Sequence, residues 1–451
     1  AIEVRDNARS VGHCRLSATL LSCRRQATAD NLRGDYRKVK GIELLAPARD
    51  LDCGIAAVQA GADAVYIGAR QFGARSKASN TLDDIAVLVE HAHTYWARVY
   101  VTVNTLLYDH EIPQAVALIY QLHAIGVDAV IIQDVGLLEQ TLPPIALIAS
   151  TQMHNHTPER VKFLEDVGFQ RVILARELSL TEIREIREQT SIELETFVHG
   201  ALCVSYSGQC YMSYAVGGRS GNRGECAQPC RRPYTLVDRE GRILLKDKYL
   251  LSLKDLNLSA HLGDLLDAGV GSFKIEGRLK DENYVRNVVS FYRQRLNTAM
   301  EMRGLVRGSS GSSRILFEPH LDKTFNRDYT TYFLEGRTQS PGAIDTPKMT
   351  GEALGPVIAV GPHTFTLKTT VELHNGDGIC FFGPNGALRG TVINGVRAGD
   401  RQVVITPNAL EGIRAGTIVY RNRDHEFLQT LERHPPERTI GVSFLLSDAE
   451  D

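Results

Sequence analysis

Eight short apolar runs alternate with stretches of helical length, and this alternation constrains the fold more than any other feature of the chain. Continuous, β-branched-rich runs of this length are typical of strands buried on both faces. The segments between them, such as DDIAVLVEHAHTYW, carry apolar residues at the i, i+3, i+4 spacing of a helix. The runs are residues 42–46, 63–68, 98–104, 128–134, 146–151, 171–176, 193–200 and 272–277.

Eight strand–helix units within one segment predict an α/β fold, a (β/α)8 barrel of the TIM type over residues 41–305. An open doubly wound sheet is the alternative, but it usually has only about five to seven strands. Barrels of this type place catalytic groups where strands end. We therefore expect the active site among the polar residues that follow the apolar runs.

The predicted site residues fall into two groups. Guanidinium groups at the strand ends could pair with the carboxylates of a substrate in a bidentate manner. His199 is the predicted proton-transfer group, Arg278 completes the catalytic set, and Glu276 either acts as a base or orients Arg278. A purely structural Glu–Arg pair is an equally good interpretation of the last two. The predicted substrate-binding residues are Asn104, Gln152, Arg176 and Lys274.

Other polar residues at strand ends have a simpler interpretation. Asp134, Ser150 and Thr151 each precede a helical stretch, so their side chains could accept hydrogen bonds from its free N–H groups. For these residues capping and function remain open.

Four of the eight cysteines fall in one window with the spacing C-x6-C-x15-C-x3-C: Cys203, Cys210, Cys226 and Cys230. They lie in an insertion after the seventh run, residues 200–257, which should hang over the barrel mouth. Four thiolates at this spacing can surround one inorganic centre. Zinc sites more often use C-x2-C pairs, which favours an iron–sulfur cluster without excluding zinc. A disulfide pair is disfavoured because nothing in the sequence indicates secretion.

The insertion also combines cations with aromatic residues. Tyr206, Tyr211, Tyr214 and Tyr234 are interleaved with arginines, a mixture suited to base stacking and phosphate contacts. A solvated loop with ordinary tyrosines is the alternative. The predicted RNA-binding residues are Arg219, Arg223, Arg231 and Arg232.

Composition limits the partners. A formal net charge of -2 gives no overall electrostatic signal for nucleic acid, so any RNA contact must be local. No stretch has the apolar core of a signal peptide or the length of a membrane span. We therefore expect no membrane partner and a cytoplasmic protein with reduced thiols. The sequence does not indicate an oligomeric state.

Three segments lie outside the predicted barrel. Residues 1–40 hold seven arginines without periodicity, so we expect a poorly ordered extension, with a targeting role open. Residues 306–345, which include GSSGSS, are interpreted as a linker. Residues 346–451 carry short strands and turn signals such as HNGDG, so they predict a small β-rich domain that ends early, with RNA docking as its role by analogy only.

Several long motifs resemble the U32 family, historically described as collagenase-like peptidases. They are ELLAPARD (43–50), GADAVYIG (61–68), ETFVHGALCVSYSGQCYMS (195–213) and SFKIEGRLK (272–280). The resemblance extends from residue 42 to about residue 440. The stretch NRGECAQPCRRPYTL (222–236) is most similar to the branch of the family that modifies large-subunit ribosomal RNA.

The resemblance implies an enzyme with a [4Fe–4S] cluster on the four cysteines. It further implies oxygen-independent hydroxylation of RNA, giving 5-hydroxycytidine in large-subunit ribosomal RNA, with prephenate as the hydroxyl donor. Ribosomal RNA and a small carboxylate donor are then the expected partners.

Three alternatives remain. A peptidase is disfavoured because the chain has no H-E-x-x-H, G-x-S-x-G or D-[ST]-G motif, although Cys203 and His199 could form a thiol nucleophile and its base. Neighbouring branches of the family imply hydroxylation of tRNA uridine instead. A non-catalytic RNA-binding factor, whose cluster only holds the insertion in place, would share the same motifs.

Overall fold

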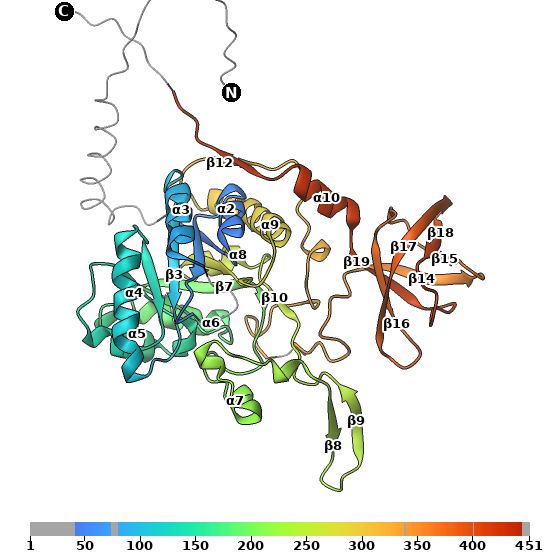
Figure 1. The fold of residues 1–451 in the computed structure, drawn as a ribbon, viewed down its shortest axis with the longest axis horizontal. Helices are drawn as coiled ribbons and strands as arrows, with labels where there is room; N and C mark the ends of the chain where they lie inside the picture. The colour runs from blue at the N-terminus through green and yellow to red at the C-terminus, as the bar shows by residue number, and fades with distance from the viewer. Residues whose placement is uncertain (1–40, 74–79, 338–339, 400, 444–451) are drawn as a thin grey trace, which may run out of the picture. The chain divides into compact units, whose positions relative to one another are not determined.

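The computed structural model describes residues 41–73, 80–337, 340–399 and 401–443, which form two closed barrels and the segments that join them (Figure 1). The arginine-rich residues 1–40 lie outside the described residues. No described helix is long and apolar enough to cross a membrane.

All eight predicted strands are present, and they form a parallel barrel. β1 to β7 pair in chain order, and β11 closes the barrel by pairing with both β1 and β7. The apolar runs thus become strands because burial on both faces favours them. Their bounds are β1 (Glu43–Pro47), β2 (Ala64–Gly68), β3 (Arg98–Val103), β4 (Ala129–Ile132), β5 (Ala146–Ala149), β6 (Arg171–Ile173), β7 (Glu193–Ala201) and β11 (Val270–Ile275).

Helices surround the strands, and side-chain caps fix where several of them begin (Figure 1). Asp50 accepts from the backbone N–H of Cys53 at the start of α2, while Thr81 and Asp84 form a capping box at the start of α3. The helices are α2 (Leu51–Gln59), α3 (Leu82–His93), α4 (Ile112–Ala124), α5 (Pro158–Asp166), α6 (Leu180–Gln189), α8 (Leu262–Asp267) and α9 (Glu282–Glu301).

One connection departs from the predicted alternation. Between β4 and β5 the chain forms the 3-10 helix η2 (Val135–Glu139) where we expected an α-helix. Asp134 caps η2 by accepting from Gly136, and Ser150 caps the 3-10 helix η3 (Thr151–Met153) by accepting from Gln152. The capping interpretation of these two residues is therefore confirmed.

A charged cluster fills part of the barrel interior. Nη1 of Arg171 lies 2.5 Å from Oε1 of Glu43 and 2.9 Å from Oε2 of Glu195, and Nζ of Lys274 lies 2.8 Å from Oε1 of Glu195. Burial alone would raise the pKa of Glu43, but Arg171 and Arg98 beside it hold that pKa below its usual value. We call Glu43, Arg171, Glu195 and Lys274 the interior charge cluster.

The cysteine insertion leaves the barrel after β7 and contains short elements. It ends in β10, which pairs antiparallel with β7 and places Asn257 opposite His199. Its elements are α7 (Met212–Gly217), η4 (Gly221–Arg223), η5 (Pro229–Arg231), the hairpin of β8 (Tyr234–Val237) with β9 (Ile243–Lys248), and β10 (Asp255–Asn257).

The interpretation of residues 306–345 as a linker is wrong. The segment includes β12 (Ser312–Arg314), η6 (Leu321–Lys323) and β13 (Tyr329–Thr330), and β13 pairs with β10. Leu321, Tyr332 and Leu334 are buried in the core of the large barrel. Burial of these apolar residues outweighs the flexibility that the glycine and serine residues suggested.

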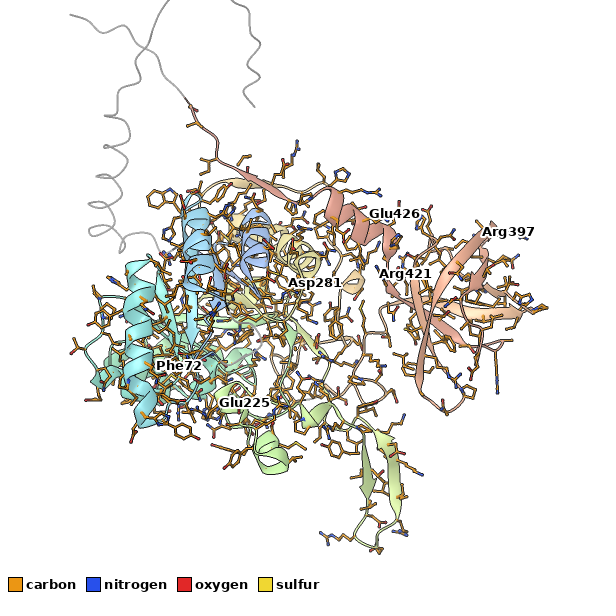
Figure 2. All side chains as sticks on the ribbon, in the orientation of Figure 1. Phe72, Glu225, Asp281, Arg397, Arg421 and Glu426 are labelled. Carbon is orange, nitrogen blue, oxygen red and sulfur yellow. The ribbon has the colours of Figure 1, made fainter. Side chains whose placement is uncertain are left out.

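The predicted β-rich domain is a closed six-stranded antiparallel barrel with its own apolar core, including Phe365 and Ile379. Its strands are β14 (Glu352–Val360), β15 (Phe365–Leu367), β16 (Gly378–Phe382), β17 (Leu388–Gly399), β18 (Gln402–Pro407) and β19 (Ile418–Arg423). Arg421, labelled in Figure 2, is buried and forms ion pairs with Glu352, Asp377 and Asp424.

The chain then returns to the large barrel through α10 (His425–Arg433) and β20 (Glu437–Thr439). β20 pairs antiparallel with β12, so the strands before and after the small barrel lie side by side. Arg438 anchors this return by donating to the carbonyl oxygens of Val58, Ala62 and Ser310.

Candidate functional site

Arg176 and Glu276 meet at the carboxyl ends of β6 and β11. Nη2 of Arg176 lies 2.7 Å from Oε2 of Glu276, and its Nη1 donates to the carbonyl oxygen of Ala201 at 2.8 Å. The guanidinium carbon lies 3.8 Å from the ring centroid of Phe197. The ion pair and the aromatic ring hold the guanidinium in one orientation at the mouth of the barrel.

A second guanidinium stands at the same mouth. Nη1 of Arg278 donates to Oγ1 of Thr102 at 2.7 Å, and its guanidinium carbon lies 5.7 Å from the ring centroid of Tyr66. Close by in the chain, Asn104 donates to Oγ of Ser150 at 3.2 Å. The backbone carbonyl of Gln152, rather than its side chain, accepts from Nε2 of Gln133 at 3.3 Å. Two guanidiniums therefore stand at the carboxyl ends of different strands, and binding of a substrate by Arg176, Asn104 and Gln152 stays a prediction.

Lys274 does not reach the mouth. Its ammonium lies inside the barrel on Glu195 and 4.3 Å from the centroid of Tyr66, and burial lowers its pKa while Glu195 opposes this. Its position fits the interior charge cluster, so the expectation of a substrate ligand at this residue is wrong.

His199 is also placed differently from the prediction. The side chain is 1% exposed and lies among the rings of Tyr284, Tyr292 and Tyr329, with the hydroxyl of Tyr292 3.3 Å from its Nδ1. Burial, helped by Lys280, lowers the pKa of His199 to about 3. A neutral imidazole inside an aromatic cluster is not available for proton transfer at the mouth. The pairing of β7 with β11 shifts register beside this residue, and single-sequence periodicity does not reveal such a shift.

A different histidine occupies the mouth, on the loop after β5. His154 has a φ of 58°, its Nδ1 lies 3.4 Å from Oε1 of Glu177, and its ring packs on His156 at a centroid distance of 3.8 Å. Burial and then His156 lower the pKa of His154, so the imidazole is held neutral. The sequence did not single out His154, although it follows the same strand end as Gln152.

Glu177 links this histidine to the cysteine insertion. Its carboxylate accepts from the backbone N–H and from the hydroxyl of Ser207, both at 2.9 Å. Gly208 lies directly against the carbonyl oxygen of Gln152, where a Cβ would stand only 1.8 Å away, and its φ of +71° suits glycine. The insertion therefore rests on the same loops that carry the mouth residues.

Arg231 holds the insertion from inside. Its guanidinium donates to Oγ of Ser252 and to the carbonyl oxygens of Leu253 and Leu202, each at 2.8 Å. These bonds use its donors within the protein, so the expectation that Arg231 grips phosphate is wrong.

The other predicted RNA-binding arginines differ in their surroundings. Arg223 forms a bidentate pair with Glu111 on the barrel, Arg219 donates to the carbonyl oxygen of Glu225, and Arg232 is exposed. Tyr206, Tyr211 and Tyr214 are more than half exposed, which leaves their rings open to contact. Base stacking on these rings stays a prediction.

The four cysteines of the insertion are free thiols. Cys203 and Cys210 are in contact, and this hydrogen bond lowers the pKa of Cys210 to about 5 while it raises the pKa of Cys203. Burial raises the pKa of Cys230, and the thiols of Cys226 and Cys210 add to that effect. Across the described residues, no three His, Cys, Asp or Glu side chains are grouped closely enough to hold a metal ion.

The donor set nevertheless fits an iron–sulfur cluster by its chemistry. Four thiols lie on one insertion. Cys203 and Cys210 are in contact, and burial together with the charges of Cys226 and Cys210 raises the pKa of Cys230. Thiolates are the ligands that such clusters use. Zinc accepts the same donors, so the chemistry of the thiols leaves both metals open.

The model of peptidase family U32 matches residues 49–343 of this chain. The chain belongs to that family. The U32 match covers the large barrel from the loop after β1 onward, together with the cysteine insertion.

Curated U32 relatives carry different activities in their names. A 23S rRNA 5-hydroxycytidine synthase of Escherichia coli is 48% identical over 90% of this chain and 63% of its own length. The tRNA hydroxylation protein P1 of Bacillus subtilis is 36% identical over 76% of this chain and 83% of its own length. A collagenase of Porphyromonas gingivalis is 31% identical over 77% of this chain and 87% of its own length. The chain thus spans less than two thirds of the E. coli protein.

The thiol nucleophile and base that Cys203 and His199 could have formed for a peptidase are not brought together. The imidazole of His199 packs on three tyrosine rings, whereas the thiol of Cys203 bonds to Cys210. The two side chains therefore have separate partners.

Proposed function

We propose that this chain hydroxylates RNA and forms 5-hydroxycytidine in large-subunit ribosomal RNA, with prephenate as the hydroxyl donor. The observation that carries the proposal is the 48% identity, over 90% of the chain, with a protein named for that synthesis. The arrangement of charges at the barrel mouth supports it independently.

The two mouth guanidiniums suit a dicarboxylate. Arg176 is held by Glu276 and Arg278 by Thr102, so each enters the site with its orientation already restricted. Each guanidinium can bind one carboxylate of the donor through parallel N–H···O bonds. Glu276 then acts as a positioning residue for Arg176.

Proton transfer is assigned to His154. A neutral imidazole can accept a proton, and the carboxylate of Glu177 next to Nδ1 stabilises the imidazolium that results. Ser207 keeps that carboxylate in place through its two hydrogen bonds.

Cys203, Cys210, Cys226 and Cys230 would hold a [4Fe–4S] cluster. When bound, the cluster supplies one-electron redox chemistry next to the mouth. Anaerobic purification should give a brown protein with about four irons per chain. Stoichiometric zinc without iron would contradict this assignment.

The decisive experiment compares nucleosides from a strain lacking the gene with those from the complemented strain. Mass spectrometry should show 5-hydroxycytidine lost from the large-subunit fraction and restored on complementation. The tRNA fraction is measured in parallel, because a relative is named for tRNA hydroxylation. A change confined to tRNA would move the substrate to that class.

The second candidate function is that of a peptidase, and the similarity to a collagenase supports it. Unchanged RNA together with degradation of gelatin by the pure protein would favour it. Arg278→Lys in the complementing gene is a further check, because it should reduce hydroxycytidine formation while iron content stays unchanged.

A further inference from the structure

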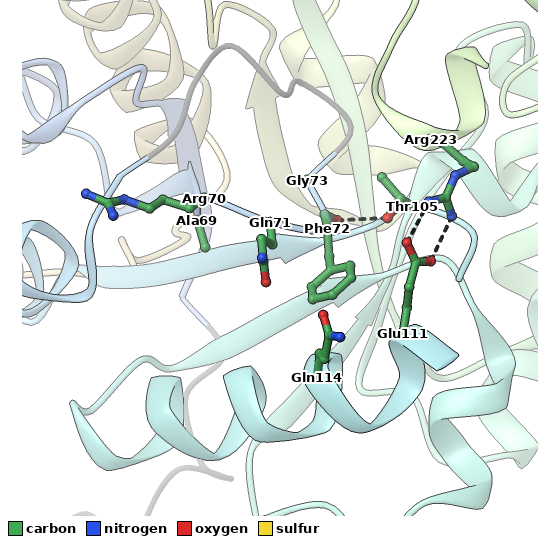
Figure 3. A pocket seen from close by; sticks show the side chains of 9 residues that line it. All are labelled: Ala69, Arg70, Gln71, Phe72, Gly73, Thr105, Glu111, Gln114 and Arg223. Atoms are coloured by element: carbon green, nitrogen blue, oxygen red, sulfur yellow. Dashed lines mark hydrogen bonds and ion pairs between the residues drawn. The ribbon is translucent and has the colours of Figure 1, made fainter. Parts of the chain in front are cut away.

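A pocket of about 210 Å³ lies on the rim of the large barrel, outside the pair of mouth arginines. Three segments form it: the loop after β2, the β3–α4 region and the cysteine insertion (Figure 3). Pockets for whole drug-sized ligands are larger, at about 300–1,000 Å³. This pocket therefore has room for one ring system rather than for a complete cofactor.

Phe72 supplies an aromatic surface to the pocket. Its backbone has a φ of 63°, a conformation that a bulky residue seldom adopts, and Oγ1 of Thr105 donates to its carbonyl oxygen at 3.2 Å. In Figure 3 the ring points across the pocket toward Gln114. The loop thus holds an aromatic side chain at the edge of the barrel in a fixed but unfavourable backbone conformation.

Two amides border the ring. Gln71 and Gln114 line the pocket, and among the contacts of the described residues neither side-chain amide has a hydrogen-bond partner. An amide offers one acceptor and two donor hydrogens, which is what the edge of a nucleobase requires.

The charges around the pocket favour a polyanion. Arg223 pairs with Glu111 at 2.7 and 2.9 Å, so this carboxylate is neutralised, and Arg223 lowers the pKa of Glu111 to about 2. Arg70 is exposed at the opposite side of the lining. Within the lining one cation is therefore in excess, and this arginine also attracts the carboxylate of Asp84 outside the lining. A phosphate next to a bound base would lie beside it.

The pocket borders the candidate site. A Cβ placed on Gly73 would stand 3.3 Å from Oγ1 of Thr102 and 3.9 Å from Nη1 of Arg278. The residue after Phe72 thus touches the pair that orients one mouth arginine.

We propose that this pocket binds one unstacked base of a nucleotide that flanks the target cytidine, with Phe72 as the stacking surface. The inference rests on the proposed function as an RNA hydroxylase. Stacking on an aromatic side chain combined with amide contacts to a base edge is how proteins hold single-stranded RNA.

Short single-stranded RNA, labelled for fluorescence anisotropy, tests the proposal on the full chain. Phe72→Ala should weaken binding about 5- to 150-fold, the range measured for one stacked base, without changing the salt dependence. Arg70→Ala should instead reduce the slope of log K against log salt by about one. Phe163→Ala is the matched control, because this exposed phenylalanine lies on α5 away from the pocket lining.

Two further measurements separate stacking from damage to the fold. Phe72→Trp in a Trp96→Phe background, which removes the single natural tryptophan, should keep RNA affinity, and RNA should quench its fluorescence. A set of RNAs with one abasic position each should contain one that binds the native protein as weakly as intact RNA binds Phe72→Ala.

The outcomes separate the two proposals. If Phe72→Ala binds RNA with unchanged affinity, or if RNA does not quench the fluorescence of Phe72→Trp, the pocket does not bind a base. The proposed function still holds in that case if 5-hydroxycytidine is formed. Absence of RNA binding by the native protein overturns the pocket, and it overturns the proposed function as well only if RNA from the strain lacking the gene is unchanged.

Discussion

The interior of the large barrel and the cysteine insertion hold their polar groups in opposite ways. In the interior, side chains pair with side chains: Arg171 joins Glu43 to Glu195, and Lys274 completes the set, all of them buried. In the insertion, Arg231 binds mainly backbone carbonyls instead, and ion pairs such as that of Arg223 with Glu111 are partly exposed.

The large barrel and the cysteine insertion also differ in how far they bury their apolar side chains. The barrel strands bury almost every large apolar side chain, whereas Tyr211, Val216 and Leu244 in the insertion are 62%, 66% and 58% exposed. The barrel therefore carries its own stability, and the insertion depends on its anchors. A change in the barrel interior should affect the whole unit, while a change in the insertion should act locally.

Arg171→Met removes the central cation of the interior charge cluster and should have the largest effect on stability. The substitution leaves Glu43 without its main cation in a buried site, which should cost about 3–5 kcal/mol of the free energy of unfolding. Urea denaturation measures it, with Arg242→Met, on an exposed hairpin arginine, as a control that should leave that free energy unchanged. A loss below about 1 kcal/mol would mean that the barrel does not rely on this cluster.

Arg231→Met should act on the insertion alone. Loss of its donors leaves buried carbonyls unpaired, at about 1–3 kcal/mol for the local equilibrium. Hydrogen exchange should speed up in residues 203–230, while the urea midpoint of the barrel stays in place. A shift of the whole transition would show that the two regions unfold as one.

Glu111→Gln should have a smaller effect, because the pair with Arg223 is partly exposed. We expect about 0–1 kcal/mol, measured as the difference in unfolding free energy from the native protein. Since the pair lowers the pKa of Glu111 from 4.5 to about 2, its stabilisation is complete above pH 4.5 and disappears as pH falls through 2. A difference that persists at pH 2 would assign the effect to packing.

Lys280 offers a reactivity test with no expected change in stability. Burial lowers its pKa to about 8, so labelling by an acylating reagent should rise through pH 8 as the ammonium loses its proton. Peptide mass spectrometry follows the modification. Lys274, enclosed in the barrel interior, should stay unlabelled, and equal labelling of both lysines would contradict its enclosure.

The sequence predicted the barrel because burial on both faces produces runs that a single chain displays directly. It predicted which residues stand at strand ends: Arg176 and Glu276 form an ion pair there, and Arg278 bonds to Thr102. It did not predict the direction of each side chain, which depends on register.

Lys274 and His199 illustrate that limit. Lys274 points below the mouth because its strand position faces Glu195, and His199 lies beside a register shift. Arg231 was misassigned for another reason, since backbone carbonyls that need donors are invisible in a sequence. His154 was not predicted, although it follows the carboxyl end of β5 just as Gln152 does.

The pairing of β12 with β20 has a consequence for how the molecule would behave when cut. The chain enters the small barrel after β12 and leaves it before β20. These two strands pair with each other, and Arg438 on β20 donates to the carbonyl oxygens of Val58 and Ser310. A single protease nick in a turn such as residues 383–386 should therefore give two bands on a denaturing gel but one particle by gel filtration. The two segments that join the small barrel to the rest of the chain are therefore held together by a pair of bonded strands.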